Sequence, residues 1–478
     1  MPLIMKQFEA EAKPVLYRFI RVIVKIAMAI FFQKIELRNG ESVPARGPVV
    51  FVANHPNSIM DALVMGAVTK RKVNYIGHAG LFSNKLKSWF LRSCGVIPVY
   101  RREDAPDKME QNVAAFESCF EALENGETIG IFPEGTSDML RKVKRVKTGA
   151  ARIVLEAERR NGYQLGVTVL PIGLYFFSRS RFRSKVMVNV GKPIALTPFF
   201  ETNERSNAEA VQQLTAEIQQ HLEHLTVNIQ HQELDQFVRD IEWLYRDELK
   251  ADAFPDSRSQ KAAATEFILT QRIAECVEYY FSHQPERVRE MQEKINAYKR
   301  KLNRLHLKDN MLKETQNFWQ LLRASFWTFM KALIGFPVAA YGVANNFIPY
   351  LISESFAKKF IDERTKILSA LFIGGSLVFI GFYAVQAFTV WYFSGPVWSS
   401  LYLLSLPITG LFALAYIKDI RQEQERISFS FFLFTNRQLF FKMRRERKLL
   451  IAEMDQIKNE YLNLMGRPTQ IKERQTEV

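Results

Sequence analysis

A run of about fifty residues without a charged side chain, from Ile367 to Ile417, constrains the fold of this chain more than any other feature. One crossing of the hydrocarbon core of a membrane needs about twenty apolar residues, so the run is long enough for two crossings. Ser394-Gly395-Pro396 lies near its middle, where a turn between two helices is needed. We therefore predict a hairpin of two membrane spans, at 368–391 and 397–417.

A second uncharged stretch, Ala332 to Ser353, precedes the hairpin. Lys and Arg gather on the cytoplasmic side of membrane proteins, and here they flank both stretches everywhere except at the turn. All these flanks, and the domain before them, are therefore expected on the cytoplasmic side of a multi-pass membrane protein. The stretch 332–353 would then enter the membrane and return, since Pro337, Asn345-Asn346 and Pro349 interrupt a helix where a reversal needs it. The alternative is a third span, which would place the tail after residue 417 outside.

The excess of basic side chains narrows the class of partner. The chain has 65 Lys and Arg against 50 Asp and Glu, a formal net charge of +15. Such an excess favours an anionic partner, either nucleic acid or the anionic face of a lipid bilayer. The uncharged stretches favour the bilayer, so no nucleic-acid partner is expected. The three cysteines are widely spaced and form no CxxC pair, so neither a disulfide framework nor a zinc site is predicted.

Residues 15 to 32 have the pattern of an amphipathic helix. Arg18, Arg21 and Lys25 share one face at helical spacing. The opposite face is apolar and consists of Phe19, Ile20, Ile23, Ala27, Ile30 and Phe31. This pattern is typical of a helix that lies in the membrane interface, and we assign residues 1–34 to such an element. The alternative is an amphipathic helix packed on its own domain.

Between Gly47 and Pro198, short β-rich runs alternate with helical stretches, which indicates an α/β domain. We expect strands at 49–52, 129–132, 167–170 and 186–190, and helices near 60–68, 84–93, 108–124 and 148–160. The predicted fold class is therefore α/β, with a mostly buried mixed sheet flanked by helices at 35–204. We expect a charged helical extension at 205–315, a membrane region at 316–417 and a basic helical tail at 418–478.

His55 and Asp61 directly follow the first predicted strand, in Asn54-His55-Pro56-Asn57-Ser58-Ile59-Met60-Asp61. The carboxyl end of a strand is where α/β folds place their sites. A histidine titrates near neutral pH, and a carboxylate beside it can fix its tautomer and stabilise its charged form. Alone, the pair is a weak signal, because His and Asp often occur at this spacing by chance.

Three further segments carry polar side chains at the ends of apolar runs. Phe132-Pro133-Glu134-Gly135-Thr136-Ser137 offers a carboxylate and a hydroxyl suited to a polyol, with Gly135 allowing close approach to the backbone. Gly95 to Arg101 delivers an arginine, whose planar fork of donors matches phosphate. Lys147 precedes Thr148-Gly149-Ala150, which opens a helix whose N-terminus would attract phosphate. The alternatives are a polar turn, a surface arginine and a solvated basic loop.

In this order and spacing, the segments resemble the conserved blocks of the glycerolipid acyltransferase family, the glycerol-3-phosphate and lysophosphatidate acyltransferases. The match covers roughly residues 35 to 200, with Leu170-Pro171-Ile172-Gly173 resembling the fourth block. The resemblance implies a thioester donor (acyl-CoA or acyl-carrier protein as co-substrate), a glycerol-phosphate or lysophospholipid acceptor, and neither metal nor other cofactor. It also implies that His55 is the general base and Asp61 its orienting partner, and that the acceptor is held by Arg101, Glu134, Gly135 and Thr136, with Lys147 added from its place before the helix.

Two departures from the family pattern refine this expectation. The common box has four residues between His and Asp, whereas Pro56 to Met60 make a longer gap here. The arginine that usually follows Pro-Glu-Gly-Thr is replaced by Ser137-Asp138. Both features resemble the glycerol-3-phosphate and dihydroxyacetone-phosphate branch of the family, which favours the first acylation of the glycerol backbone. They leave open how the phosphate is held.

Three alternatives to this function stay open at this point. A lysophosphatidate or other lysophospholipid acyltransferase would carry the same blocks. A catalytically inactive membrane scaffold would keep the fold, although the intact His55, Asp61, Glu134 and Gly135 argue against it. The third alternative, a nucleic-acid-binding protein, is suggested only by the net charge of +15.

Overall fold

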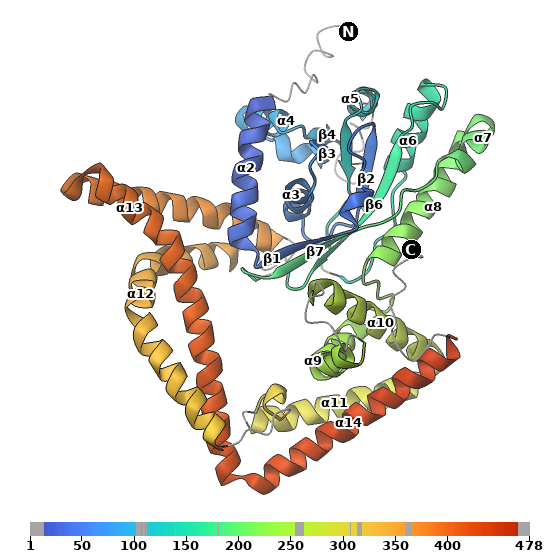
Figure 1. Ribbon diagram of the computed structural model, residues 1–478. Helices are drawn as coiled ribbons and strands as arrows, with labels where there is room; N and C mark the ends of the chain where they lie inside the picture. Colours follow the sequence, from blue (N-terminus) through green and yellow to red (C-terminus); the bar gives the residue numbers. More distant parts are fainter. Residues whose placement is uncertain are drawn as a thin grey trace.

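The computed structural model describes residues 14–101, 107, 110, 112–138, 140–179, 181–253, 262–305, 307–312, 318–358 and 366–466. A seven-stranded sheet lies at its centre in the order β1-β7-β6-β2-β5-β3-β4 (Figure 1). Among the strand pairs of the described residues, β6–β7 is antiparallel and the others are parallel, so the predicted α/β class with a mixed sheet is confirmed. The strands are β1 Lys34–Arg38, β2 Val49–Ala53, β3 Val73–His78, β4 Ile97–Val99, β5 Thr128–Ile131, β6 Thr168–Phe176 and β7 Lys185–Val190.

Helices cover both faces of this sheet because its central strands are apolar on both sides. Successive side chains of a strand point to opposite faces, so Val50 and Val52 face one way and Val49 and Phe51 the other. The first face packs on α5 Asn112–Glu124, α6 Gly149–Arg160 and α8 Asn207–Leu225, and the second on α2 Pro14–Phe31 and α3 Ile59–Val68. Near the sheet the chain also forms α4 Lys85–Ser93, α7 Thr197–Arg205 and the short 3-10 turns η1 Gly40–Ser42 and η2 Ala79–Phe82.

Helix α2 divides its apolar residues between the domain and the exterior. Met28 and Phe31 are buried on the sheet, and the Arg21 guanidinium donates to the backbone carbonyls of Thr69 and Lys70. An apolar stripe stays exposed, made of Phe19, Val22, Ile23, Ile26 and Ile30. The helix therefore packs on its own domain and also presents a surface of the kind that enters a membrane interface.

After the sheet domain, α9 Leu234–Ala253, α10 Ala262–His283 and α11 Pro285–Arg304 form a helical extension. Its core also contains Tyr175 of β6 and Met187 of β7, so the extension packs on the sheet. The 3-10 turn η4 Asp309–Leu312 ends the extension. Two long helices follow, α12 Phe318–Lys358 and α13 Ile367–Thr435, and α14 Arg437–Leu464 completes the described chain. Helix α13 has two arms that meet at Gly395, whose φ of 83° is not helical, so the break lies at the predicted turn.

Two segments, Ser325–Lys358 and Ile367–Gln424, are long and apolar enough to cross a membrane. Only 17% and 22% of their most apolar windows are buried in the protein. The first arm of α13 begins against the sheet domain, where Leu368 and Phe372 are buried and the Phe372 ring meets the edge of Phe31, with 5.3 Å between ring centroids. The apolar region is thus attached to the domain at the start of this arm.

The predicted interruption of the helix within 332–353 is wrong, because α12 runs as one helix through Pro337 and Pro349. A proline lacks the N–H that would bond the carbonyl four residues earlier, so Pro349 leaves the Asn345 carbonyl without that partner. The amide Nε2 of Gln386, on the first arm of α13, donates to this carbonyl at 3.1 Å. A neighbouring helix therefore replaces the missing bond, and the helix continues.

Helix α14 returns to the helical extension and packs against α9, α11 and η4 (Figure 1). Arg447 is 7% exposed and donates to Asp309 at 2.9 Å, to Glu248 at 2.6 Å and to the carbonyl of Leu244 at 3.2 Å. Exposed ion pairs to α11 flank this buried one, including Lys301 with Glu446. The basic tail is therefore an integral part of the extension in the described residues.

We predict that Arg447→Ala destabilises the folded protein by about 3–5 kcal/mol, because it leaves Asp309 buried without its cation. Lys301→Ala removes an exposed ion pair that also joins α11 to α14, and it is expected to lower the stability by less than about 1 kcal/mol. Thermal unfolding of the full chain in detergent compares the two variants. Equal losses would show that the buried pair does not hold α14 in place.

Candidate active site

The carboxyl ends of five strands meet at one edge of the sheet. β2, β5, β3 and β4 run parallel to one another, and β6 runs parallel to β2. His55 follows β2, Glu134 follows β5, Arg179 follows β6 and Arg101 follows β4. This edge is where open α/β sheets bind their ligands.

His55 and Asp61 are brought together as predicted from their order after β2. The Nδ1 atom of His55 lies 2.8 Å from Oδ2 of Asp61, which is fully buried in the first turn of α3. The N–H of Asn57 donates to the same oxygen at 2.8 Å. The longer gap between the two residues is taken up at Ser58, whose φ of 53° turns the chain into α3.

This contact determines what the histidine ring can do. With Nδ1–H donating to the carboxylate, Nε2 carries the free lone pair of the neutral ring and can accept a proton. The ring stacks on Phe132 with centroids 4.3 Å apart, and its side chain keeps 15% exposure. His55 is thus fixed in one orientation while it stays accessible from outside.

Burial without a full countercharge raises the pKa of the Asp61 carboxyl, against the opposing effects of the His55 hydrogen bond and charge. Burial raises the pKa of Glu134 in the same way, although two backbone N–H donors oppose it. The site therefore contains two carboxylates whose ionised forms cost folding free energy.

Glu134, which is expected to hold the acceptor, accepts backbone N–H groups from both loops of the site. Its Oε1 accepts the N–H of His55 at 2.8 Å and its Oε2 accepts the N–H of Lys144 at 3.2 Å. The residue is 5% exposed. Glu134 therefore ties the loop that carries His55 to the loop that carries the basic residues.

The basic residues after β5 lie over Gly135 and Thr136. Lys144 Nζ donates to Thr136 Oγ1 at 3.2 Å and pairs with Asp138 at 3.0 Å. Gly135 has φ of 74°, and a Cβ there would stand 3.0 Å from Nζ of Lys147. Any side chain at position 135 would therefore displace Lys147 from this edge.

Arg101 is the predicted site residue that lies farthest from His55 along the sheet. It follows the edge strand β4, which is separated from β2 by β5 and β3. Three strand spacings of about 4.8 Å place the strand ends roughly 14 Å apart. Arg101 is therefore at the site edge but not beside the histidine.

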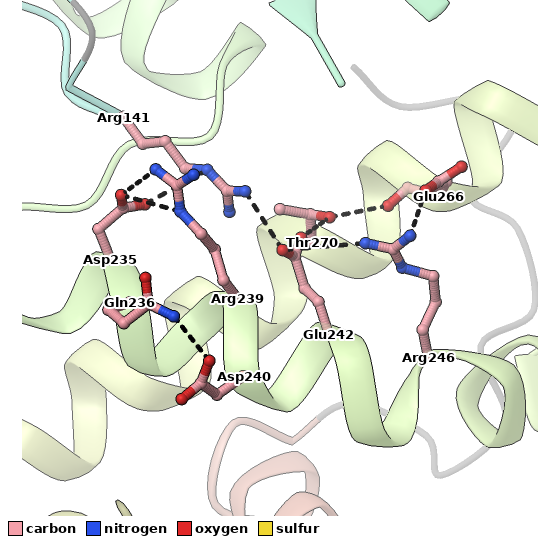
Figure 2. A network of polar contacts seen from close by, with 9 residues as sticks. All are labelled: Arg141, Asp235, Gln236, Arg239, Asp240, Glu242, Arg246, Glu266 and Thr270. Atoms are coloured by element: carbon pink, nitrogen blue, oxygen red, sulfur yellow. Dashed lines mark hydrogen bonds and ion pairs between the residues drawn. The ribbon is translucent and has the colours of Figure 1, made fainter. Parts of the chain in front are cut away.

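Two arginines that the sequence did not single out belong to this edge. Arg141 pairs with Asp235 at 3.3 Å and with Glu242 at 3.2 Å, both on α9, and Figure 2 shows this network. Arg179 donates from Nη1 to the carbonyls of Asp138 and Leu140, at 3.4 Å and 3.2 Å. Strand β6 extends to Phe176, beyond the predicted end at 170, and this extension brings Arg179 to the site.

Comparison with known proteins defines the class of the domain. Residues 34–175 match the family model described as Acyltransferase. The recognition of the glycerolipid acyltransferase family is thereby confirmed, and the sheet domain of this chain is an acyltransferase domain.

The chain is similar to glycerol-3-phosphate O-acyltransferase 1 of Saccharomyces cerevisiae, with 26% identity over 264 residues, 54% of this chain and 32% of the relative. A chloroplastic 1-acyl-sn-glycerol-3-phosphate acyltransferase of Arabidopsis thaliana is 28% identical over 144 residues, 30% of this chain and 36% of the relative. An uncharacterised acyltransferase of Schizosaccharomyces pombe is 21% identical over 91% of this chain and 80% of its own length. The chain thus spans about a third of the first two relatives. The acyltransferase PlsC of Thermotoga maritima is 20% identical over 46% of this chain and 86% of its own, with a TM-score of 0.33.

We predict that Asp61→Asn lowers acyl transfer by about 10⁴-fold, because the amide disturbs the tautomer and charge stabilisation of His55. The same variant is expected to melt at a higher temperature than the native protein at pH 8. Because the folded pKa of Asp61 lies above its ordinary value of 3.8, the ionised carboxylate costs stability above the folded pKa, and this cost disappears as the pH falls toward 3.8.

Melting curves of the native protein and Asp61→Asn between pH 8 and pH 4 test this, and the difference between them should shrink toward the acid end. Glu121→Gln, an exposed carboxylate on α5, is the control and should show no such trend. An Asp61→Asn protein that melts below the native one at pH 8 would mean that the carboxylate stabilises the fold.

Proposed function

We propose that this chain is a membrane-bound O-acyltransferase that moves a fatty acyl group from a thioester donor to a hydroxyl of glycerol 3-phosphate or dihydroxyacetone phosphate. The observation that carries the proposal is the His55–Asp61 contact of 2.8 Å, at a strand edge lined with basic side chains. The geometry leaves Nε2 of His55 as the proton acceptor toward the solvent side.

The reaction follows from this arrangement. Nε2 takes the proton of the acceptor hydroxyl as its oxygen attacks the thioester carbonyl carbon. The carbon–sulfur bond of the tetrahedral intermediate then breaks, and the thiolate leaves with the proton that His55 holds. Asp61 stays ionised and stabilises the imidazolium between these two steps.

The choice of glycerol 3-phosphate over lysophosphatidate is supported by three features. They are the longer gap between His55 and Asp61, Ser137 in place of the usual arginine, and the similarity to a yeast glycerol-3-phosphate O-acyltransferase. The second candidate, a lysophosphatidate acyltransferase, is favoured by the similarity to the Arabidopsis protein. An inactive scaffold has no need to keep the carboxyl groups of Asp61 and Glu134 buried.

We predict that membranes carrying the native protein acylate glycerol 3-phosphate or dihydroxyacetone phosphate faster than lysophosphatidate, when labelled acyl-CoA is the donor. His55→Ala should lose at least about 10²-fold of this activity, because it removes the general base. Exposed His283, replaced by alanine, is the matched control and should keep full activity. Faster use of lysophosphatidate would favour the second candidate, and transfer by His55→Ala above a tenth of the native rate would remove His55 from the mechanism.

The membrane part of the proposal is supported by the exposed apolar surfaces of α12, α13 and the stripe on α2. The start of α13, in the middle of this region, and helix α14, which follows the region, attach to the domains beside it. Leu368 packs on the sheet domain, and α14 is held to the extension by Arg447. Because α14 packs on the same assembly as the sheet, we favour an even number of crossings between the two over the three-span arrangement. The basic flanks support a cytoplasmic position for this assembly.

We predict that a cysteine at Ser394, beside the turn of α13, reacts with an impermeant thiol reagent on intact cells, whereas one at Asn463, exposed on α14, reacts only after permeabilisation. Both are introduced after Cys94, Cys119 and Cys276 have been replaced by alanine. Labelling at 463 from outside would contradict the shared side of α14 and the sheet domain.

A further inference from the structure

The basic side chains near His55 differ in whether a carboxylate already neutralises them. Lys144 pairs with Asp138, and Arg141 pairs with Asp235 and Glu242 of α9. Figure 2 shows that the two α9 carboxylates approach Arg141 from the helical extension. These two cations therefore have little free charge to offer a ligand.

Arg179 is different, since within the described ranges of the chain no carboxylate lies within ion-pair distance of it. Within those ranges, its hydrogen bonds run from Nη1 to the backbone carbonyls of Asp138 and Leu140. Those carbonyls fix the plane of the guanidinium and leave Nε and Nη2 as donors on its other side. Burial, and next the charge of Arg141, lower the pKa of Arg179, whereas Tyr175 and the charges of Asp61 and Asp235 oppose this. An anion bound here would offset the cost of holding the half-buried cation near Arg141.

Arg179 lies on the side of the site next to β6, which is the direct neighbour of β2. Strand β6 continues to Phe176, beyond Ile172, the partner of Ala53 at the end of β2. The chain after β6 still reaches the loop of His55, because Nη1 of Arg179 donates to the carbonyl of Asp138 at 3.4 Å. In extended glycerol 3-phosphate, five bonds separate the terminal hydroxyl oxygen from the phosphorus, a distance of roughly 6 Å, so a group that holds the phosphate has to lie near His55. Arg101 follows β4, which lies three strands from β2 on the other side.

The loop contacts connect the two ends of such a ligand. Arg179 holds the carbonyl of Asp138, and the N–H of Asp138 donates to the carbonyl of His55 at 3.2 Å. The guanidinium and the catalytic ring are thus joined through one residue. Asp138 stands next to Ser137, where the family arginine is replaced.

We propose that Arg179 binds the phosphate of the acceptor through Nε and Nη2, in place of the arginine that usually follows the Pro-Glu-Gly-Thr block. This inference rests on the proposed function, because it names the group that recognises the acceptor of that reaction. A guanidinium binds phosphate in the same way in the ground state and in the transition state, so its contribution appears mainly in KM.

The test compares Arg179→Gln, Arg179→Lys and Arg101→Gln, with Arg205→Gln, an exposed arginine of α7, as the control. Loss of a charged hydrogen bond of about 1.5–3 kcal/mol corresponds to a rise of about 10- to 150-fold in the KM for glycerol 3-phosphate. We expect such a rise for Arg179→Gln with kcat nearly unchanged, a smaller rise for Arg179→Lys, and a smaller one for Arg101→Gln. Arg205→Gln should match the native protein. A larger KM effect for Arg101→Gln than for Arg179→Gln would overturn the proposal.

A binding measurement separates this inference from the proposed reaction. Inorganic phosphate is expected to raise the melting temperature of the native full chain in detergent and of Arg205→Gln, but not that of Arg179→Gln. If the native protein acylates no glycerol phosphate yet shows this pattern, the proposed reaction fails while the anion site stands. If the native protein is active and Arg179→Gln keeps both its KM and its stabilisation by phosphate, Arg179 is not the phosphate site. Should Arg179→Gln fail to fold, Arg179→Lys decides by the same two measurements, since an unchanged KM there would overturn the proposal.

Discussion

The arrangement of this site depends on one buried carboxylate. Asp61 has no exposed surface, and its Oδ2 meets the ring of His55 and the N–H of Asn57 at 2.8 Å each. Its charge is costly where it stands, because burial raises the pKa of the carboxyl. The same contact fixes the tautomer and the plane of the His55 ring, and this orients the ring for proton transfer. Glu134 repeats the pattern one strand away, where a second buried carboxylate ties together the backbone of the two site loops.

The remaining parts of the chain are connected to this edge by specific contacts. The extension reaches the site loop through Arg141, which Asp235 and Glu242 hold from α9. The same extension receives α14 through the buried pair of Arg447 and Asp309. The long apolar helices therefore leave and rejoin one assembly, with the Leu368 contact near the sheet and α14 at the far end. In our proposal this brings the site close to the membrane that holds the acyl chains.

Sequence patterns predicted the parts of the fold that are governed by local composition. The apolar runs of β2, β5 and β7 and the helices α3 and α6 lie where periodicity places them. β1 was not predicted, although Lys34–Arg38 alternates charged and apolar residues as a half-buried strand does. The run is only five residues long, and its partner β7 is distant in the sequence. β4 has three residues, one of them Pro98, and its pairing with β3 is likewise invisible in the local sequence.

In the site and in the membrane region, too, local patterns could be read from the sequence, whereas contacts between distant segments could not. His55 and Asp61 were identifiable because they are near in sequence and follow a clear strand, whereas Arg179 depends on how far β6 extends. The contacts of Glu134 could not be read from the sequence, because its oxygens accept backbone N–H groups of His55 and Lys144 from two separate segments. The continuity of α12 depends on Gln386, forty-one positions from the carbonyl it bonds. Contacts between distant segments decide each of these points.

The most direct test of the account is a structure of the native protein with glycerol 3-phosphate bound and no acyl donor present. The central claim is that His55 accepts the proton of an acceptor hydroxyl. If His55 is the proton acceptor, a glycerol hydroxyl oxygen of the bound acceptor lies within about 2.6–3.2 Å of Nε2 of His55, the distance required for proton transfer. A bound acceptor with no hydroxyl facing Nε2, at the edge formed by β2 and β6 or elsewhere, would contradict it.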